Sequence, residues 1–250
     1  MATFSNYQNI LPDPNNVIGD SGAATGTVGG PGFKSVKLSS KTKTMKSRTN
    51  SGRILTRSHA YQQWDIRITY NPMTREEFEP VYNFLLFRQG ALKPFYVSLP
   101  QYKTPRDTKF ATYTSSNTVS VEGGDYPAGS TSMRIDGSAM TGPISGDPKP
   151  GDLFTITDAS DAGHTKAYMV NRVETSTEYA SGADEPTGPQ STDERRIHFT
   201  PPLSKLTRNN STINFNDPKI RVILSKDVTE YSLGVNNLYS FSLMLEEVQP

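Results

Sequence analysis

The chain of 250 residues is long enough for one large domain or two modest ones, each with its own core. Its lack of cysteine excludes disulfides, thiolate metal sites and a cysteine nucleophile, and a net charge of +1 argues against strong nucleic-acid character overall. No apolar run reaches the roughly 20 residues of a membrane-spanning helix, and the polar first residues give no reason to expect secretion.

The first part of the chain has the composition of an arm rather than a domain. Residues 1–33 are rich in Asn, Gly and Ser and hold too few apolar side chains to fold alone. Residues 34–57 contain no acid, and the alternation around Val36 and Leu38 predicts extended chain. We therefore expect residues 1–53 to form an extended N-terminal arm and linker. The cations of the basic run are Lys34, Lys37, Lys41, Lys43, Lys46, Arg48, Arg53 and Arg57.

Three interpretations of this basic run remain open. A solvated face is the commonest origin of such a pattern. Contact with an acidic protein comes second. Nucleic acid comes third, because no aromatic residues interleave with the cations for base stacking. The loop from Glu174 to Glu194 is acidic and lacks Lys and Arg, so we take Glu185 and Glu194 as candidate contacts for the basic run on another subunit.

A strand, a helix and a second strand are predicted in the next segment. Residues 64–70 alternate between apolar and polar side chains, as in a half-buried strand. Thr74 and Glu77 have the spacing of a capping box, and Gly90 is placed to end the helix. Pro80 should either tilt the first turn or mark the start of the regular helix. The strand that follows is bounded by prolines, at 94–100.

The rest of the chain is dominated by strand signals. Five short strand-like pieces separated by turn clusters predict a small barrel or sandwich within 111–212. They are residues 117–122, 131–136, 153–157, 167–173 and 196–200. Strong alternation returns at 220–224 and at 239–245, and the last strand is a plausible partner of 64–70.

We therefore expect a mainly β fold with two folded parts. A β-barrel or sandwich core with one helix would be built from residues 54–110 with 213–250. An inserted domain, OB-like or another small β-barrel, would occupy residues 111–212.

Catalytic chemistry is sparse in this sequence. The three histidines are His59, His164 and His198. They lie far apart in the sequence, and with no cysteine in the chain they do not have the spacing of metal ligands. There is no Gly-x-Ser-x-Gly elbow. The acids at 76–79 fit a first helical turn better than a glycosidase pair. We expect no enzyme, no catalytic residue, no cofactor and no metal site.

The order of these segments resembles the distal tail proteins and related minor tail proteins of tailed phages. The resemblance begins with the strand at 64–70 and MTREEFEPVYNFLLFRQGALKPFYVSLP, and ends with LYSFSLMLEEV, which is similar to the closing strand of that family. Between them, PGDLFTI, KAYMVNRV and IHFTPPL resemble the inserted barrel of several members. The resemblance covers about residues 60–250, and residues 1–53 take no part in it.

The resemblance implies a structural virion protein assembled in the host cytoplasm. The family forms rings, commonly hexamers, that act as adaptors between the tail tube and the baseplate hub or tail tip. DNA passes through the lumen without specific binding, and no membrane is involved. The basic residues would then be candidates for subunit interfaces.

The alternative is a peripheral tail module whose inserted barrel binds host-surface carbohydrate. Its candidate platform residues are Tyr126, Tyr168 and Tyr179, although the strand pattern favours a core position for Tyr168. A cell-wall enzyme and a nucleic-acid binder are further alternatives.

Overall fold

The computed structural model describes residues 9–14, 30–137, 143–158, 160–161, 163–175, 178, 193–227 and 229–249, and for 58–61 it describes the backbone only. The protein is mainly β, with 46% strand and 14% helix, and contains a closed six-stranded barrel and a curled half-barrel sheet. The fold class expected from the sequence is therefore confirmed. The chain divides into two compact units, Met1–Val97 with Arg221–Val248, and Ser98–Ile220 with Gln249–Pro250.

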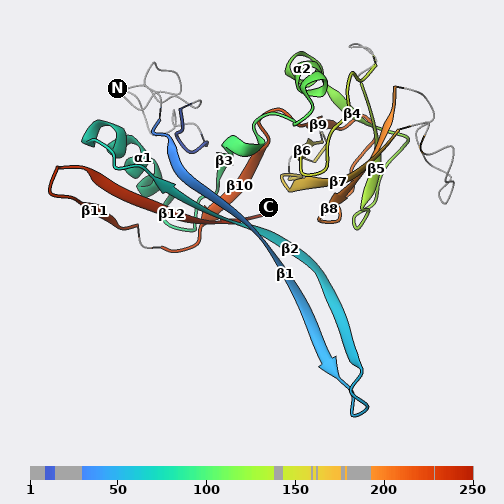
Figure 1. Ribbon diagram of the computed structural model, residues 1–250, viewed down its shortest axis with the longest axis horizontal. Coiled ribbons are helices and arrows are strands. Elements are labelled where there is room, and N and C mark those ends of the chain that lie inside the picture. Colours follow the sequence, from blue (N-terminus) through green and yellow to red (C-terminus); the bar gives the residue numbers. More distant parts are fainter. Residues whose placement is uncertain are drawn as a thin grey trace. The chain divides into compact units, whose positions relative to one another are not determined.

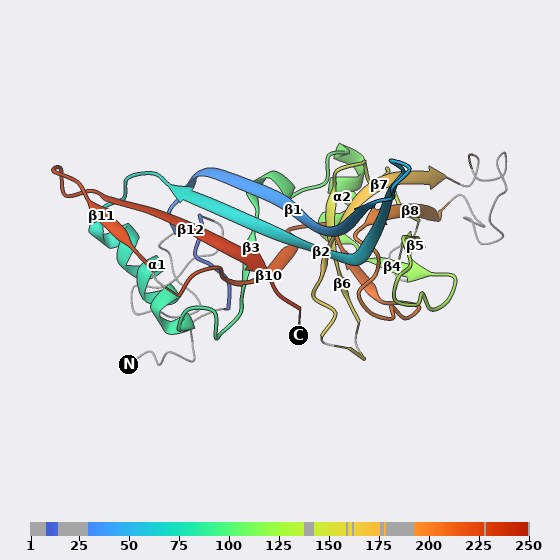
Figure 2. The ribbon, with the colours of Figure 1, turned by 90° about the horizontal axis from the view of Figure 1, so that it is seen from below.

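The first unit is built on an antiparallel sheet (Figure 1). Its order is β1 (Phe33–Arg48), β2 (Ile54–Tyr70), β12 (Tyr239–Glu247), β10 (Lys219–Leu224) and β3 (Phe95–Ser98), with β11 (Tyr231–Leu233) paired to β12. Figure 2 shows β1, β2 and β12 running side by side. The predicted pairing of the last strand with the 64–70 strand is confirmed by the register Leu243 to Ile68 and Leu245 to Ile66.

Helix α1 (Arg75–Arg88) has the cap that the sequence predicted. The backbone N–H and hydroxyl of Thr74 both donate to the Glu77 carboxylate, at 2.9 and 3.0 Å. The regular helix starts at Arg75, so Pro80 lies inside it rather than at its start. Gln89 takes the left-handed conformation that ends the helix, with φ of 55°, and Gly90 follows at 65°.

The second unit contains the barrel and two short helical segments. The barrel order is β4 (Val119–Glu122), β5 (Ser132–Gly137), β8 (Arg195–Thr200), β7 (Ala167–Thr175), β6 (Leu153–Thr157) and β9 (Thr212–Asn214). Phe154 lies at the centre of its core, with ring centroids 5.5 Å from Tyr168, 5.6 Å from Phe199 and 5.2 Å from Phe215. The 3₁₀ turn η2 (Pro100–Tyr102) and helix α2 (Thr108–Ser116) precede the barrel.

The observed boundaries differ from those expected in three places. Residues 98–110 and 213–220, expected in the core domain, belong to the second unit. Helix α2 was not predicted, and it is held by Asp107, which caps it by accepting the Phe110 N–H at 2.9 Å, and by the burial of Phe110 and Tyr113. Residues 33–53, expected in an arm or linker, belong to the β1–β2 hairpin of the first unit.

Candidate assembly interface

We call residues 33–42 and 62–70 the root of the β1–β2 hairpin, and this part belongs to the sheet. Val36 pairs with Ile68 and Leu38 pairs with Ile66, and both isoleucines are buried. On its other side, β2 pairs with β12 over residues 65–69. The root is therefore held on both edges of β2, which fixes its position in the first unit.

Beyond this root the hairpin leaves the sheet. The register shifts between Thr42, which faces Gln62, and Thr44, which faces Ser58, so β2 contains two extra residues there. Such irregularities bend a strand and increase its twist. Figure 1 shows the hairpin continuing past the other strands of its unit. We call residues 43–57 the distal hairpin.

The distal hairpin has no core of its own. Every residue in it is exposed except the half-buried Thr49. Three large apolar side chains are among the exposed ones, with exposed fractions of 58% for Met45, 57% for Ile54 and 48% for Leu55. Met45 and Leu55 lie on one face of the ribbon and Ile54 on the other, since Met45 pairs with Arg57 and Ile54 pairs with Arg48. Large apolar side chains that are exposed on both faces of one hairpin are candidates for a protein interaction surface.

The tip is a defined turn. The Thr49 N–H donates to the Arg53 carbonyl and the Gly52 N–H donates to the Thr49 carbonyl, each at 2.9 Å. The Thr49 hydroxyl also accepts the Arg53 N–H at 3.2 Å. Gly52 has φ of +83°, a conformation that other residues rarely adopt. These bonds keep the two strands together at the end that is farthest from the sheet.

Both outer edges of the distal hairpin are available for pairing. In the described part of the chain, β1 pairs with β2 alone, so the outer edge of Thr44–Arg48 has no neighbouring strand. The partnership of β2 with β12 begins only at Asp65, so Ile54–Arg57 likewise pairs with β1 alone. Exposed edges of this kind are templates for another strand.

The structure brings five of the eight predicted cations together in the distal hairpin. These are Lys43, Lys46, Arg48, Arg53 and Arg57. The remaining cations, Lys34, Lys37 and Lys41, lie on β1 nearer the root. Lys41 lies 3.6 Å from the Asp65 carboxylate, whereas no acid among the described residues forms an ion pair with the five distal cations.

The acidic candidates are placed differently. Glu194 is buried and forms an ion pair at 3.3 Å with Arg134. Glu194 immediately precedes β8, and Arg134 lies on β5, which pairs with β8. Glu174, at the other end of the acidic loop, lies 2.9 Å from Arg172. Glu185 lies outside the described residues. The described acids of this loop are therefore engaged within their own barrel.

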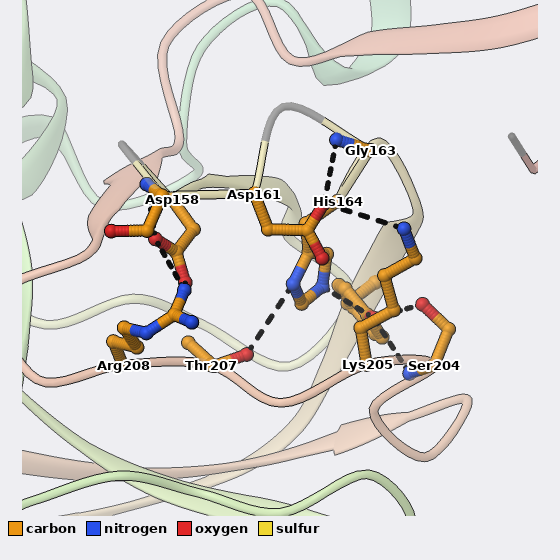
Figure 3. Close-up of polar contacts among 10 residues, drawn as sticks. Asp158, Asp161, Gly163, His164, Ser204, Lys205, Thr207 and Arg208 are labelled. Atoms are coloured by element: carbon orange, nitrogen blue, oxygen red, sulfur yellow. Dashed lines mark hydrogen bonds and ion pairs between the residues drawn. The ribbon is translucent and has the colours of Figure 1, made fainter.

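A polar cluster in the second unit ties two loops of the barrel together (Figure 3). His164 is buried, and its Nε2 lies 2.8 Å from the Tyr168 hydroxyl. Burial lowers the pKa of His164 although Asp161 and Asp158 oppose the shift. Lys205 lies 3.3 Å from Asp161, and Arg208 lies at the same distance from Asp158.

The charged groups of this cluster are paired with one another. Each of its two carboxylates is already neutralised by a cation from the opposite loop. No group of His, Asp or Glu in the described parts of the chain could hold a metal ion. The contacts join the segment after β6 to the segment after β8.

The tyrosines considered for carbohydrate binding do not form a platform in the described structure. Tyr168 is completely buried, as the strand pattern favoured. Tyr126 is half-buried against the barrel core, and its hydroxyl donates to the Glu122 carbonyl at 3.0 Å. Tyr179 lies outside the described residues.

Comparison with known proteins gave no relative. No protein-family model matches the chain, and no curated protein matches it. Within the described ranges, no helix is long and apolar enough to cross a membrane.

Proposed function

We propose that the protein is a structural subunit of a phage tail, a ring-forming adaptor between the tail tube and the baseplate or tail tip. The observation that carries this proposal is the distal hairpin, which extends past its own sheet with two available edges and three exposed apolar side chains. A two-stranded ribbon is at best marginally stable by itself in water. This supports a partner for the distal hairpin from outside the described part of the chain.

The two edges favour a closed ring of copies. The β1 edge of one hairpin is complementary to the β2 edge of the next, so the contact joins two different surfaces. Contacts of this head-to-tail kind produce rings when the rotation between copies closes. Met45, Ile54 and Leu55 would then be covered by the adjacent copy, which gives their exposure in the single chain a reason.

The order of segments supports the phage assignment. A strand, a capped helix, a second strand and an inserted barrel follow one another as in the distal tail proteins that the sequence resembles. In this proposal the first unit forms the ring and the barrel unit is peripheral. The protein carries out no reaction, takes no cofactor and functions in the virion after assembly in the host cytoplasm.

The proposal is tested by the mass of the purified protein in light scattering, over a range of concentrations. We expect a closed oligomer, with six copies as the family's common number, and its mass should not increase further with concentration. The double variant Ile54→Thr with Leu55→Thr should shift the equilibrium to monomer, because it removes exposed apolar surface from the contact.

A matched variant controls for general loss of surface hydrophobicity. Leu92→Thr with Leu206→Thr removes two exposed leucines outside the distal hairpin, and the oligomer should survive. Equal effects of the two double variants would contradict the assembly role of the hairpin. A protein that stays monomeric at every concentration and in the presence of tail tube protein would contradict the adaptor function itself.

A further inference from the structure

The distal hairpin is strongly basic. Five cations and no acid lie within its fifteen residues, 43–57. The whole chain has a net charge of only +1, so another copy offers no general excess of negative charge to balance them. We propose that the distal hairpin binds double-stranded DNA through its phosphates, without sequence preference.

The shape of the hairpin suits a duplex. A two-stranded β-ribbon fits the major groove of B-DNA, which is about 12 Å wide. Thr44–Arg48 spans about 17 Å at the usual rise of an antiparallel strand. Over that length a duplex presents roughly ten phosphates. The ribbon and its tip are therefore long enough for all five cations to reach phosphates.

The placement of the cations also favours a partner that surrounds the ribbon. Lys46 and Arg48 alternate with Met45 along β1, and Arg57 is paired with Met45 on the opposite strand. Positive charge is thus presented on both faces of the ribbon, while Arg53 lies at the turn. A groove with phosphates on both walls matches this arrangement better than a flat acidic surface does.

A duplex is favoured over a single strand. Proteins that bind single strands stack the bases on aromatic side chains, and residues 43–57 contain none. The inference goes beyond the adaptor function and does not depend on it, because a single hairpin is sufficient for binding. In a ring whose hairpins pair edge to edge, the ribbon would not enter a groove, but the cations on its faces would remain available to the phosphates of the DNA in the lumen.

The test is fluorescence anisotropy of a labelled duplex of random sequence, titrated with the full-length protein between about 50 and about 200 mM salt. Three to five phosphate contacts predict a slope of log K against log salt of about −2.7 to −4.5. The triple variant Lys43→Gln, Lys46→Gln and Arg53→Gln should bind at least about tenfold more weakly, with a slope that is smaller by about 2.7.

The control has the same change in net charge outside the hairpin. Arg75, Lys109 and Lys226 are exposed cations, and their replacement by Gln together should leave affinity and slope unchanged. Circular dichroism of both triple variants checks that they fold. Light scattering of the same samples records assembly, so a loss of DNA binding in an intact oligomer is distinguished from failure of the ring.

Three outcomes would overturn the inference. The first is no binding of the duplex at low salt. The second is an equal loss of affinity for the duplex in the control variant. The third is binding of poly-glutamate as tight as that of the duplex, with the same dependence on the hairpin cations, which would assign the surface to an acidic protein instead.

Discussion

The barrel of the second unit and the distal hairpin of the first are both antiparallel β structure, but their edges differ. Six strands close the barrel, so each has a neighbour on both sides. The distal hairpin has two strands and an available edge on each side. The barrel encloses aromatic side chains, whereas the hairpin exposes large apolar ones. The barrel therefore satisfies its strand edges within one chain, whereas the distal hairpin leaves its edges unpaired within the described residues.

The largest effect is expected in the barrel core. Phe154→Ala removes a ring that contacts Tyr168, Phe199 and Phe215, and such truncations cost about 3–5 kcal/mol. Chemical denaturation should show this loss in the unfolding of the second unit. Assembly and DNA binding should persist under native conditions, because the hairpin belongs to the first unit. Loss of both in a folded variant would contradict the separation of roles.

A smaller effect concerns pH and the polar cluster around His164. Burial lowers the pKa of His164 from 6.5, so the unfolded chain binds a proton more readily than the folded one. The stability contributed by the neutral histidine is therefore present above pH 6.5 and is lost as the pH falls below it. His164→Gln should unfold with a weaker dependence on pH than the wild type between about pH 7.5 and about pH 5.

Thermal unfolding at several pH values measures this difference. Acids elsewhere titrate in both proteins. The informative quantity is therefore the change in midpoint temperature with pH in the wild type, minus the same change in the variant. The charged groups that act on the pKa of His164 are Asp158 and Asp161, which raise it, and Lys205, which lowers it. An identical pH dependence in wild type and His164→Gln would show that the histidine does not titrate in this cluster.

The smallest effect is expected at the root of the hairpin. Lys41 and Asp65 form an ion pair at 3.6 Å, but the lysine side chain is 58% exposed. Such pairs contribute at most about 1 kcal/mol, and often nothing measurable. Lys41→Gln should therefore leave the midpoint of denaturation nearly unchanged. A large loss of stability would mean that charge, rather than the Val36 and Leu38 packing, anchors the hairpin.

Elements with strong local signals could be predicted from the sequence. The strand at 64–70, the capped helix α1 and the closing strand each have a clear apolar period or cap. Helix α2 was missed because its sequence, TKFATYTSS, is rich in threonine and serine, which favour helix weakly. Its stability comes from the burial of Phe110 and Tyr113 in the barrel core, a tertiary effect that local pattern does not reveal.

The candidate site was predictable in part. The basic run identified the cations, and the alternation around Val36 and Leu38 identified extended chain. The free-standing ribbon could not be foreseen, because a segment exposed on both faces has no apolar period to read. The ion pair of Glu194 could not be predicted either, because its partner Arg134 is 60 residues away in sequence.

The absence of cysteine permits a direct test of hairpin pairing by cross-linking. Thr44→Cys lies on β1 and Ile54→Cys lies on β2, where they face Ser58 and Arg48 rather than each other. Within one hairpin they are separated by about four residues along the strands, or about 13 Å. A short cross-linker therefore reports contacts between copies.

We predict that the double cysteine variant gives a ladder of covalent oligomers ending at the size of the closed ring, while each single variant gives almost none. That result follows if the β1 edge of one copy meets the β2 edge of the next in a register that places Thr44 near Ile54. Covalent dimers from either single variant, with no ladder from the double variant, would show a two-fold contact and contradict the ring. An assembled protein without any cross-link would place the subunit contacts outside the distal hairpin.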